Sequence, residues 1–366
     1  MKRLIANLAL TAAAFTLAFL LGEGAVRLLY KQDSILFPRY HTDYHYGRYA
    51  IRGIRPNADF WHTSADGSWH FVTNSKGFRD TREFAYAKPP GTLRILVLGD
   101  SHTQGYEVRQ DATYAAVAER FLSYRGTRAE AINAGVSGYS TAEALVFLEN
   151  EGYQYHPDVV VLGFYANDFE DNLKAGLFAL DGDRPAERKT AHLPGVSIQN
   201  AIYSLAPVRW LSENSYFYSL LFNGVWENAK VWLARAAVRD AAAGGTAPPQ
   251  PEYAIAGTEN LSASQVALAA ALLERMQRFC AERGIRLIVA DIPTRGEPHR
   301  FGSSLPPALR ARLDAAGIEY LPSEAVLAAA DGAAEFHVAH GHHHISEFTH
   351  ALIGVEIGRR LLPPRR

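Results

Sequence analysis

The chain has 366 residues and a formal net charge of −1, with 37 Lys and Arg against 38 Asp and Glu. Hydrophobic residues make up 48% and charged residues 20%, which is typical of globular proteins and excludes a mostly disordered chain or a multi-pass membrane protein. No basic field attracts nucleic acid, so we expect no nucleic-acid partner. The single cysteine, Cys280, excludes an intramolecular disulfide and a cysteine-based zinc cluster, and we expect it in the core.

The N-terminus carries an apolar run, Leu4–Leu21, preceded by Lys2 and Arg3. Its length is near the lower limit of a membrane-spanning helix, and no small-residue cleavage signature follows it. We therefore favour an uncleaved anchor over a cleaved signal peptide or a buried helix. Positive charges on the two flanks nearly balance, because Arg27 and Lys31 follow the run. Since long domains translocate largely regardless of flanking charge, we expect an inner-membrane anchor with the domain in the periplasm or at the cell exterior, or secretion after cleavage.

Composition divides the chain into three parts. Residues 1–30 form the anchor or signal segment. Residues 31–90 contain short alternating stretches and turn residues, which predict a small β-rich lead-in. Residues 91–366 form the main domain, with a mainly helical insert at about 175–255.

The insert contains an aromatic stretch, Tyr203–Trp232. Three interpretations stay open for this stretch. It is a lid over an acyl pocket, a segment at the membrane with Trp210, Trp226 and Trp232 in the interface, or a helical excursion packed on the core.

Strands and helices alternate in the main domain. In chain order the prediction is strand Leu93–Leu98, helix Tyr114–Tyr124, strand Ala129–Asn133, helix Thr141–Asn150 and strand Val159–Tyr165, then, after the insert, helix Ser262–Arg283, strand Arg286–Ile292, helix Pro306–Ala315, strand Ile318–Leu321 and helix Ser346–Leu362. The strands are almost continuously apolar, which is typical of parallel strands buried on both faces. We therefore predict an α/β domain with a central parallel sheet.

Polar residues that suit acyl transfer follow the first three strands. The first strand leads directly into Gly99-Asp100-Ser101. Gly138 follows the second strand and Asn167 the third, so all are expected at the ligand-binding edge of the sheet. The amides of Ser101 and Gly138 and the side-chain amide of Asn167 are suitable donors to a developing oxyanion. Each segment by itself is also typical of an ordinary turn.

A serine nucleophile needs a base. The dense histidine cluster before the last predicted helix, His340, His342, His343 and His344, lies in a strand-to-helix connection that can face Ser101. Two other interpretations are a zinc or nickel site and a plain exposed loop. We expect no metal and no cofactor, because adjacent histidines on an irregular loop rarely converge on one ion and no carboxylate or cysteine is close in sequence.

Four sequence blocks together resemble the SGNH hydrolases, also called the GDSL esterase family. They are Ile95–Gly105, Asn133–Gly138, Tyr165–Asp168 and His344–His350. The resemblance covers the α/β domain and leaves out the insert. It implies a flavodoxin-like three-layer α/β/α sandwich with a central parallel sheet.

The resemblance also implies roles for individual residues. Ser101 is implied as the nucleophile and His344 as the general base. Gly138 and Asn167 are implied to complete an oxyanion hole with the amide of Ser101. The implied chemistry is attack of Ser101 on an ester carbonyl, followed by hydrolysis of the acyl-enzyme.

The run of histidines leaves two alternative bases, His342 and His343. We prefer His344 because only this position keeps the spacing to Ser346 and His350 that the final block shows.

The chain departs from the family in the acid of the triad. The family usually has an aspartate shortly before the histidine, where this chain has Gly341 and His342. An orienting acid fixes the imidazole tautomer and stabilises the imidazolium. Three alternatives follow: a Ser–His dyad, replacement by a backbone carbonyl or a distant carboxylate such as Glu335 or Asp331, and a weak or inactive site.

We therefore expect a serine ester hydrolase outside the cytoplasm that removes short acyl groups, such as acetyl, from a small molecule or a glycan. One alternative is an O-acyltransferase that acts on an envelope polysaccharide with the same residues. The other, suggested by the missing aspartate, is a non-catalytic carbohydrate-binding or assembly protein.

Overall fold

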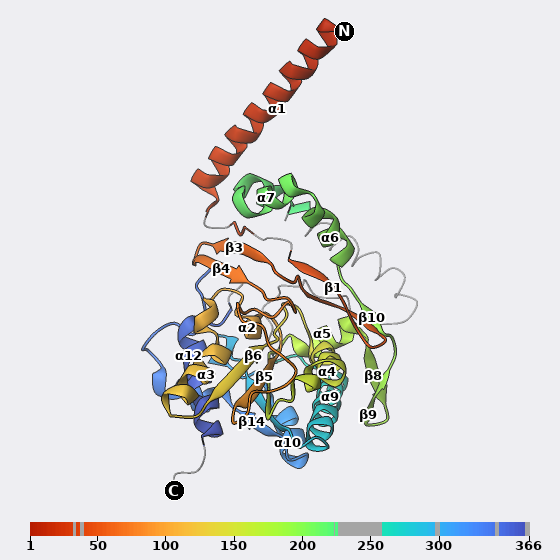
Figure 1. Ribbon diagram of the computed structural model, residues 1–366, viewed down its shortest axis with the longest axis vertical. Helices are drawn as coiled ribbons and strands as arrows, with labels where there is room; N and C mark the ends of the chain where they lie inside the picture. Colours follow the sequence, from red (N-terminus) through yellow and green to blue (C-terminus); the bar gives the residue numbers. More distant parts are fainter. Residues whose placement is uncertain are drawn as a thin grey trace.

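The computed structural model describes residues 1–31, 34–36, 40–222, 224–225, 258–296, 301–340 and 344–362. Over these residues the body of the molecule is a sheet between layers of helices, with β-hairpins over one end and a long helix projecting from that end (Figure 1). The predictions for Trp226, Trp232, His342 and His343 fall outside the described residues.

The central sheet has five parallel strands in the order β14-β11-β7-β5-β6. Their bounds are Leu93–Leu98 for β5, Ala129–Asn133 for β6, Val159–Phe164 for β7, Arg286–Asp291 for β11 and Glu319–Leu321 for β14. This is the flavodoxin-like order, with β5 and β7 adjacent at the centre. The predicted parallel α/β sheet is thus confirmed.

Helices cover both faces of this sheet (Figure 1). The main ones are α2 (Ser101–Gln104), α3 (Tyr114–Tyr124), α4 (Thr141–Asn150), α5 (Asp168–Ala175), α9 (Ala263–Ala281), α10 (Pro307–Ala315), α11 (Ser323–Leu327) and α12 (Glu347–Leu361), with short 3₁₀ turns at Gln110–Ala112, Gly152–Tyr155 and Ala328–Ala330. Ile95 and Val97 of β5 share one core with residues of α3 and α12, while Leu96 and Leu98 share the other with α4 and α9. Burial on both faces explains why the strands are continuously apolar.

The lead-in consists of two antiparallel hairpins. β1 (His41–Tyr46) pairs with β2 (Tyr49–Ile54), and β3 (Asp59–Ser64) pairs with β4 (Gly67–Val72). Their buried side chains belong to the same core as α4 and α9. The lead-in is therefore packed directly on the α/β domain.

The insert begins with strands. β8 (Phe178–Asp181) and β9 (Arg184–Glu187) form a hairpin, and β10 (Ala191–His192) pairs with β2 of the lead-in. Helices α6 (Val196–Ser204) and α7 (Ala206–Asn214) follow, and residues 216–222 are also helical. The hairpin was not predicted, although Gly182, with φ +59° in its two-residue turn, is the usual hairpin signal.

Helix α1 (Lys2–Leu29) projects away from the body (Figure 1). It has 28 residues and, among the described residues, it is the one helix long and apolar enough to cross a membrane by length and composition. Its apolar side chains are exposed along most of its length.

A further small antiparallel pair of strands, β12 (Thr294–Arg295) with β13 (Phe301–Gly302), lies beyond β11.

Candidate active site

Ser101 lies in the first turn of α2, directly after β5. The turn requires glycine before it, because Gly99 has φ +144° and a Cβ there would lie 2.1 Å from Thr103 Oγ1. The Asp100 carboxylate accepts a hydrogen bond from the His102 amide at 2.9 Å and so caps α2. This tight strand-to-helix turn presents Ser101, which is partly exposed, at the carboxyl edge of the sheet.

The structure brings His344 to this serine. Its Nε2 lies 2.7 Å from Ser101 Oγ, although the two residues are 243 positions apart. His344 immediately precedes α12 and is held by an amide–carbonyl hydrogen bond from Val338 to its backbone oxygen at 2.9 Å. Only 8% of His344 is exposed. The geometry is that of a hydroxyl nucleophile beside its base.

A carboxylate contacts the other nitrogen of the same imidazole. Glu107 Oε2 lies 3.1 Å from His344 Nδ1, and Glu107 is buried. The two suggested distant carboxylates, Asp331 and Glu335, are exposed. The suggestion of either as the acid is corrected by this geometry, because the carboxylate at the imidazole comes from the loop after Ser101. No local signal marks Glu107, since its partner is 237 positions away.

The loop that carries Glu107 is held by an arginine of the lead-in. Arg79 is 1% exposed and donates hydrogen bonds to the carbonyl oxygens of Gln104 (2.9 Å), Gly105 and Val108 (2.7 Å). Burial lowers the pKa of this guanidinium to about 9. Its three acceptors lie on both sides of Glu107 in sequence, so Arg79 fixes the loop from which the carboxylate projects.

A histidine of the lead-in also packs against this loop. His62 Nδ1 lies 2.9 Å from the backbone oxygen of Tyr106, and the two rings are 4.2 Å apart between centroids. The Tyr106 ring in turn lies 4.9 Å from the His344 ring. Burial lowers the pKa of His62 to about 4. The His62 ring is therefore uncharged at physiological pH where it packs against Tyr106.

The three candidate N–H donors belong to residues that follow β5, β6 and β7 at the carboxyl edge of the sheet. They are the amide of Ser101, the amide of Gly138 and the side chain of Asn167, whose Nδ2 lies 3.3 Å from Asp100 Oδ2. Within the described part of the chain, neither backbone amide donates to an internal acceptor. Ser101, Gly138 and Asn167 are all partly exposed, so a ligand oxygen can reach these donors.

Gly138 is held in place by a second arginine of the lead-in. The Arg52 guanidinium donates a hydrogen bond to the Gly138 carbonyl. Gly138 has φ +77°, and a Cβ there would lie 1.6 Å from Arg52 Nη2. Only glycine fits this position. The contact holds the carbonyl of Gly138, the residue whose own N–H is the candidate donor.

Asp168 joins the two loops that carry Gly138 and Asn167. Its carboxylate accepts hydrogen bonds from the amide and the hydroxyl of Thr141, the latter at 2.9 Å, and from the Tyr165 amide at 3.0 Å. Because it contacts the loops after both β6 and β7, this buried side chain fixes the two donors relative to each other.

A metal site and a reactive cysteine are two further possibilities. Over the described residues, which leave out His342 and His343, no group of three or more His, Cys, Asp and Glu side chains is arranged to hold a metal. Cys280 is fully buried in α9, and burial raises its pKa to about 12, so it is no nucleophile.

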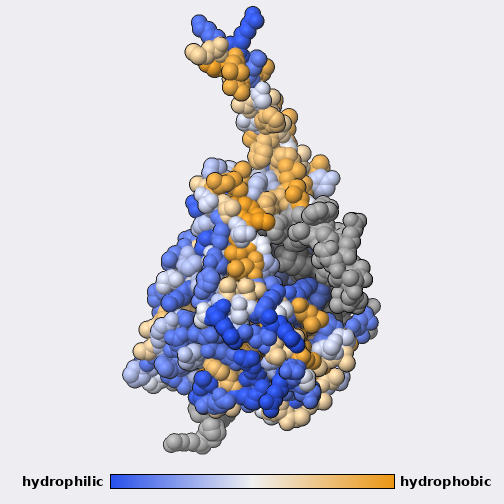
Figure 2. Space-filling view, turned by 90° about the vertical axis from the view of Figure 1, so that its right-hand side faces the viewer, coloured by the Kyte–Doolittle hydropathy of each residue, from blue (hydrophilic) through white to orange (hydrophobic). Residues whose placement is uncertain are grey.

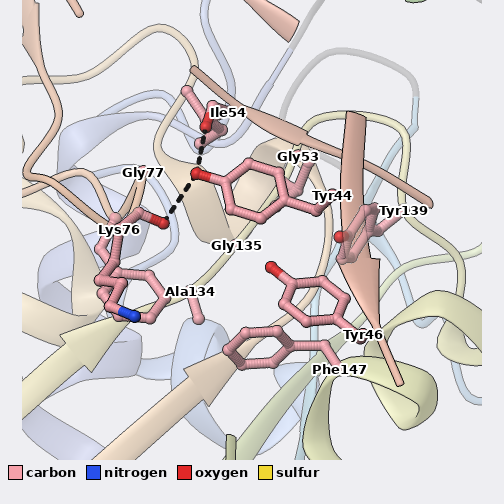
Figure 3. A pocket seen from close by; sticks show the side chains of 12 residues that line it. Tyr44, Tyr46, Gly53, Ile54, Lys76, Gly77, Ala134, Gly135, Tyr139 and Phe147 are labelled. Carbon is pink, nitrogen blue, oxygen red and sulfur yellow. Dashed lines mark hydrogen bonds between the residues drawn. The ribbon is translucent and has the colours of Figure 1, made fainter. Parts of the chain in front are cut away.

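A small cavity lies behind the loop that carries Gly138 (Figure 3). It is lined by Tyr44, Tyr46, Tyr139 and Phe147, and the Tyr44 hydroxyl lies 3.0 Å from the carbonyl oxygens of Ile54 and Lys76. Its volume of about 10 Å³ suits at most one water molecule. This cavity is too small for an acyl group.

The chain belongs to the GDSL-like lipase/acylhydrolase family, whose sequence model matches residues 97–352. The matched segment begins in β5, ends in α12 and includes Ser101, Gly138, Asn167 and His344. The chain is therefore a GDSL-type hydrolase of the esterase/lipase class. A comparison with curated proteins finds no match.

Solved structures of the same family are similar to this chain. The lipase/acylhydrolase from Enterococcus faecalis is 18% identical, with a TM-score of 0.40, and the match covers 75% of this chain and 99% of that one. TesA is 13% identical, with a TM-score of 0.40 and coverage of 74% and 98%. The acetyl xylan esterase AlAXEase is 11% identical, with a TM-score of 0.37 and coverage of 74% and 100%. At these scores the likenesses carry no argument about function.

Proposed function

We propose that this protein is a serine ester hydrolase with Ser101 as nucleophile, His344 as general base and Glu107 as the orienting acid. The observation that carries the proposal is the continuous chain of contacts from Ser101 Oγ to His344 Nε2, 2.7 Å, and from His344 Nδ1 to Glu107, 3.1 Å. A buried carboxylate at the imidazole removes the reason for preferring a non-catalytic binding protein.

The proposed reaction has two halves. His344 takes the hydroxyl proton of Ser101 as the oxygen attacks the ester carbonyl, and the carbonyl oxygen becomes an oxyanion that faces the amides of Ser101 and Gly138 and the Asn167 side chain. His344 then gives the proton to the leaving alcohol, which leaves an acyl group on Ser101. Water, activated by His344, attacks the acyl-enzyme and releases the acid. Glu107 keeps the Nδ1–H tautomer and stabilises the imidazolium in both halves.

The proposed substrate is a short-chain acyl ester, such as an acetylated glycan or small molecule. Ser101 is partly exposed, and the cavity next to the loop of Gly138, with a volume of about 10 Å³, is too small for an acyl chain. An acetyl group is small and needs little apolar surface.

The proposed location is the outer face of the inner membrane, with α1 as an uncleaved anchor. Two features support it. Helix α1 is long and apolar enough to span a bilayer, and Lys2 and Arg3 at its start favour a cytoplasmic N-terminus.

Ester turnover by the Ser101→Ala variant tests the proposed nucleophile. With p-nitrophenyl acetate as substrate, we expect kcat to fall by roughly 10⁴-fold or more, because the nucleophile is lost while the fold is kept. Ser123→Ala is the matched control, since Ser123 is exposed at the end of α3 and is expected to leave kcat unchanged. Turnover by Ser101→Ala at the wild-type rate would contradict the proposal.

A further inference from the structure

The last turns of α1 are built into the folded body. Val26 is buried, and it packs with Leu36 and Tyr216. A Cβ at Gly22 would lie 2.9 Å from the Phe217 ring, so α1 and this ring are in close contact. Phe19 meets the same ring edge-to-face, with centroids 5.4 Å apart. The end of α1 therefore has a fixed position on the insert.

A carboxylate of α1 caps a helix of the insert. Glu23 accepts hydrogen bonds from Ser215 Oγ at 2.7 Å and from the amides of Tyr216 and Phe217 at 3.1 and 2.9 Å. These amides begin the helical residues 216–222, where a negative charge is stabilising.

Arg27 adds a second polar tie between the same elements. It donates to Glu23 at 2.7 Å and to the Asn214 carbonyl at 2.9 Å, and it lies over the Tyr216 ring. Four polar contacts between side chains of one helical turn of α1 and one short segment of the insert fix the direction in which α1 leaves the body.

The helices next to this junction expose large apolar side chains. We call α6, α7 and helical residues 216–222 the platform helices. α7 lies beside the foot of α1, and α6 adjoins α7 on the side away from α1 (Figure 1). The exposed apolar residues on these helices and just after them are Ile198, Leu205, Trp210, Leu220, Leu221 and Val225. Figure 2 shows hydrophobic residues gathered where α1 meets the body.

We propose that the platform helices lie on the lipid surface through which α1 passes, with Trp210 and Leu221 in the bilayer interface. The partner of this apolar surface is lipid, because fixed contacts join α1 to the platform helices. A bilayer that contains α1 therefore also contacts the platform helices. Amphipathic helices with exposed Trp and Leu bind this interface. This inference rests on the membrane location proposed above and is independent of the catalytic residues.

The arrangement has a consequence for the substrate. α2, which carries Ser101, lies at the end of the α/β layers nearer to α1 (Figure 1). With the platform helices on the bilayer, the active site would be held at a constant height above the membrane. Esters presented at the membrane surface are then favoured over esters in bulk solution.

The full-length protein in vesicles allows a direct test. Cys280 is fully buried, so one added cysteine can be labelled selectively with the environment-sensitive dye NBD. The labelled variants are Trp210→Cys and Leu221→Cys on the platform, Phe15→Cys in the exposed apolar part of α1, and Tyr124→Cys as an exposed control at the end of α3. The vesicles contain phosphatidylcholine and phosphatidylglycerol, with and without a lipid that carries a quenching nitroxide.

Quenching by the nitroxide lipid at positions 15, 210 and 221, but not at 124, supports the proposal. Quenching at 15 alone would overturn the platform and leave the anchor in place. No quenching at 15 would overturn the membrane location itself, and ester turnover by the same preparations would show whether the catalytic proposal survives. Blue-shifted emission at 210 and 221 without quenching would mean that protein, such as a second copy, covers these helices, and it would also overturn the proposal.

The Glu23→Ala variant tests whether the junction sets the orientation. It removes three of the contacts to Ser215, Tyr216 and Phe217. We expect less quenching at positions 210 and 221 and unchanged quenching at 15. Unchanged quenching at all three positions would show that Glu23 does not hold the platform against the membrane.

Discussion

At the scale of single residues, the candidate triad combines a nucleophile and an acid from one short loop with a base from the far end of the chain. Ser101 begins α2 and Glu107 lies in the loop after this helix, while His344 precedes α12. This differs from the arrangement that the resemblance implies, in which acid and base share one segment. Here the carboxylate that contacts the imidazole comes from the segment of the nucleophile.

Removing the charge of Glu107 tests this assignment of the acid. In Glu107→Gln we expect kcat for an ester to fall by about 10² to 10⁴-fold, because the amide no longer stabilises the imidazolium or fixes its tautomer. The exposed carboxylates near His344 provide matched controls. Asp331→Asn and Glu335→Gln should keep wild-type kcat. A large loss in either control, with little loss in Glu107→Gln, would assign the acid elsewhere.

The buried His62 predicts a specific pH dependence of stability. Its pKa in the folded protein is about 4, below the ordinary value of 6.5, because burial disfavours the charged ring. Between these values the unfolded chain binds a proton that the folded chain does not, so stability falls as pH drops through this window. The contribution of His62 is a loss of about 2 kcal/mol between about pH 7.5 and pH 5.

Urea unfolding of His62→Asn at both pH values measures this contribution. We expect the variant to show a smaller loss of unfolding free energy on acidification than the wild type. His156→Asn, which changes an exposed histidine, should show the wild-type loss. An equal loss in His62→Asn and in the wild type would mean that His62 is not held neutral by the fold.

Residue-level prediction from sequence succeeds where the signal is local. Ser101, Gly138 and Asn167 each follow a strand in a recognisable turn, and the structure places all three at one edge of the sheet. Glu107 could not be found in this way, because nothing in its neighbourhood distinguishes it from a surface glutamate. Its burial and its contact with His344 arise only when segments 237 positions apart come together.

At the scale of elements, side chains of the lead-in support the candidate active site. Arg52 of β2 contacts the Gly138 carbonyl, and Arg79 holds the loop around Glu107. His62 of β3 packs against Tyr106 in the same loop. Two of the loops that carry site residues thus depend on side chains from outside the α/β domain.

A double-mutant cycle tests the link between Arg79 and Glu107. Arg79→Gln should lower kcat by about 10 to 10²-fold by loosening the loop, and it should add much less to the loss when Glu107→Gln is already present. Arg55→Gln is the matched control. Arg55 is a half-buried arginine of the same lead-in that donates to the His41 carbonyl and to Asn200. Fully additive losses for Arg79 and Glu107 would show that Arg79 supports the fold only.

Element prediction was most successful in the α/β domain, where apolar patterns are local and strong. The five strands and the helices α3, α4, α9, α10 and α12 lie where the patterns predict them. The role of the lead-in in supporting the site is not predictable from the sequence. Arg79 contacts residues 25 to 29 positions away, and no sequence motif links them to it. In the insert, the mainly helical prediction misses the hairpin β8–β9, which precedes the aromatic stretch.

At the scale of the whole molecule, three parts meet at one end. The catalytic edge of the sheet, the hairpins of the lead-in and the foot of α1 all lie on the same side (Figure 1). The sequence separates these parts clearly by composition, but it does not show that the lead-in connects the other two. In the structure, contacts of the β-hairpins and the insert therefore connect the candidate site with α1.

The central claim is that Ser101 is an activated nucleophile. Its most direct test is labelling of the purified full-length protein with a fluorophosphonate, read by intact mass and peptide mapping. We predict one adduct, on Ser101, that is lost in His344→Ala and strongly slowed in Glu107→Gln, while Ser123→Ala labels like the wild type. A folded wild-type protein that forms no adduct, or forms it on another serine, would contradict the account.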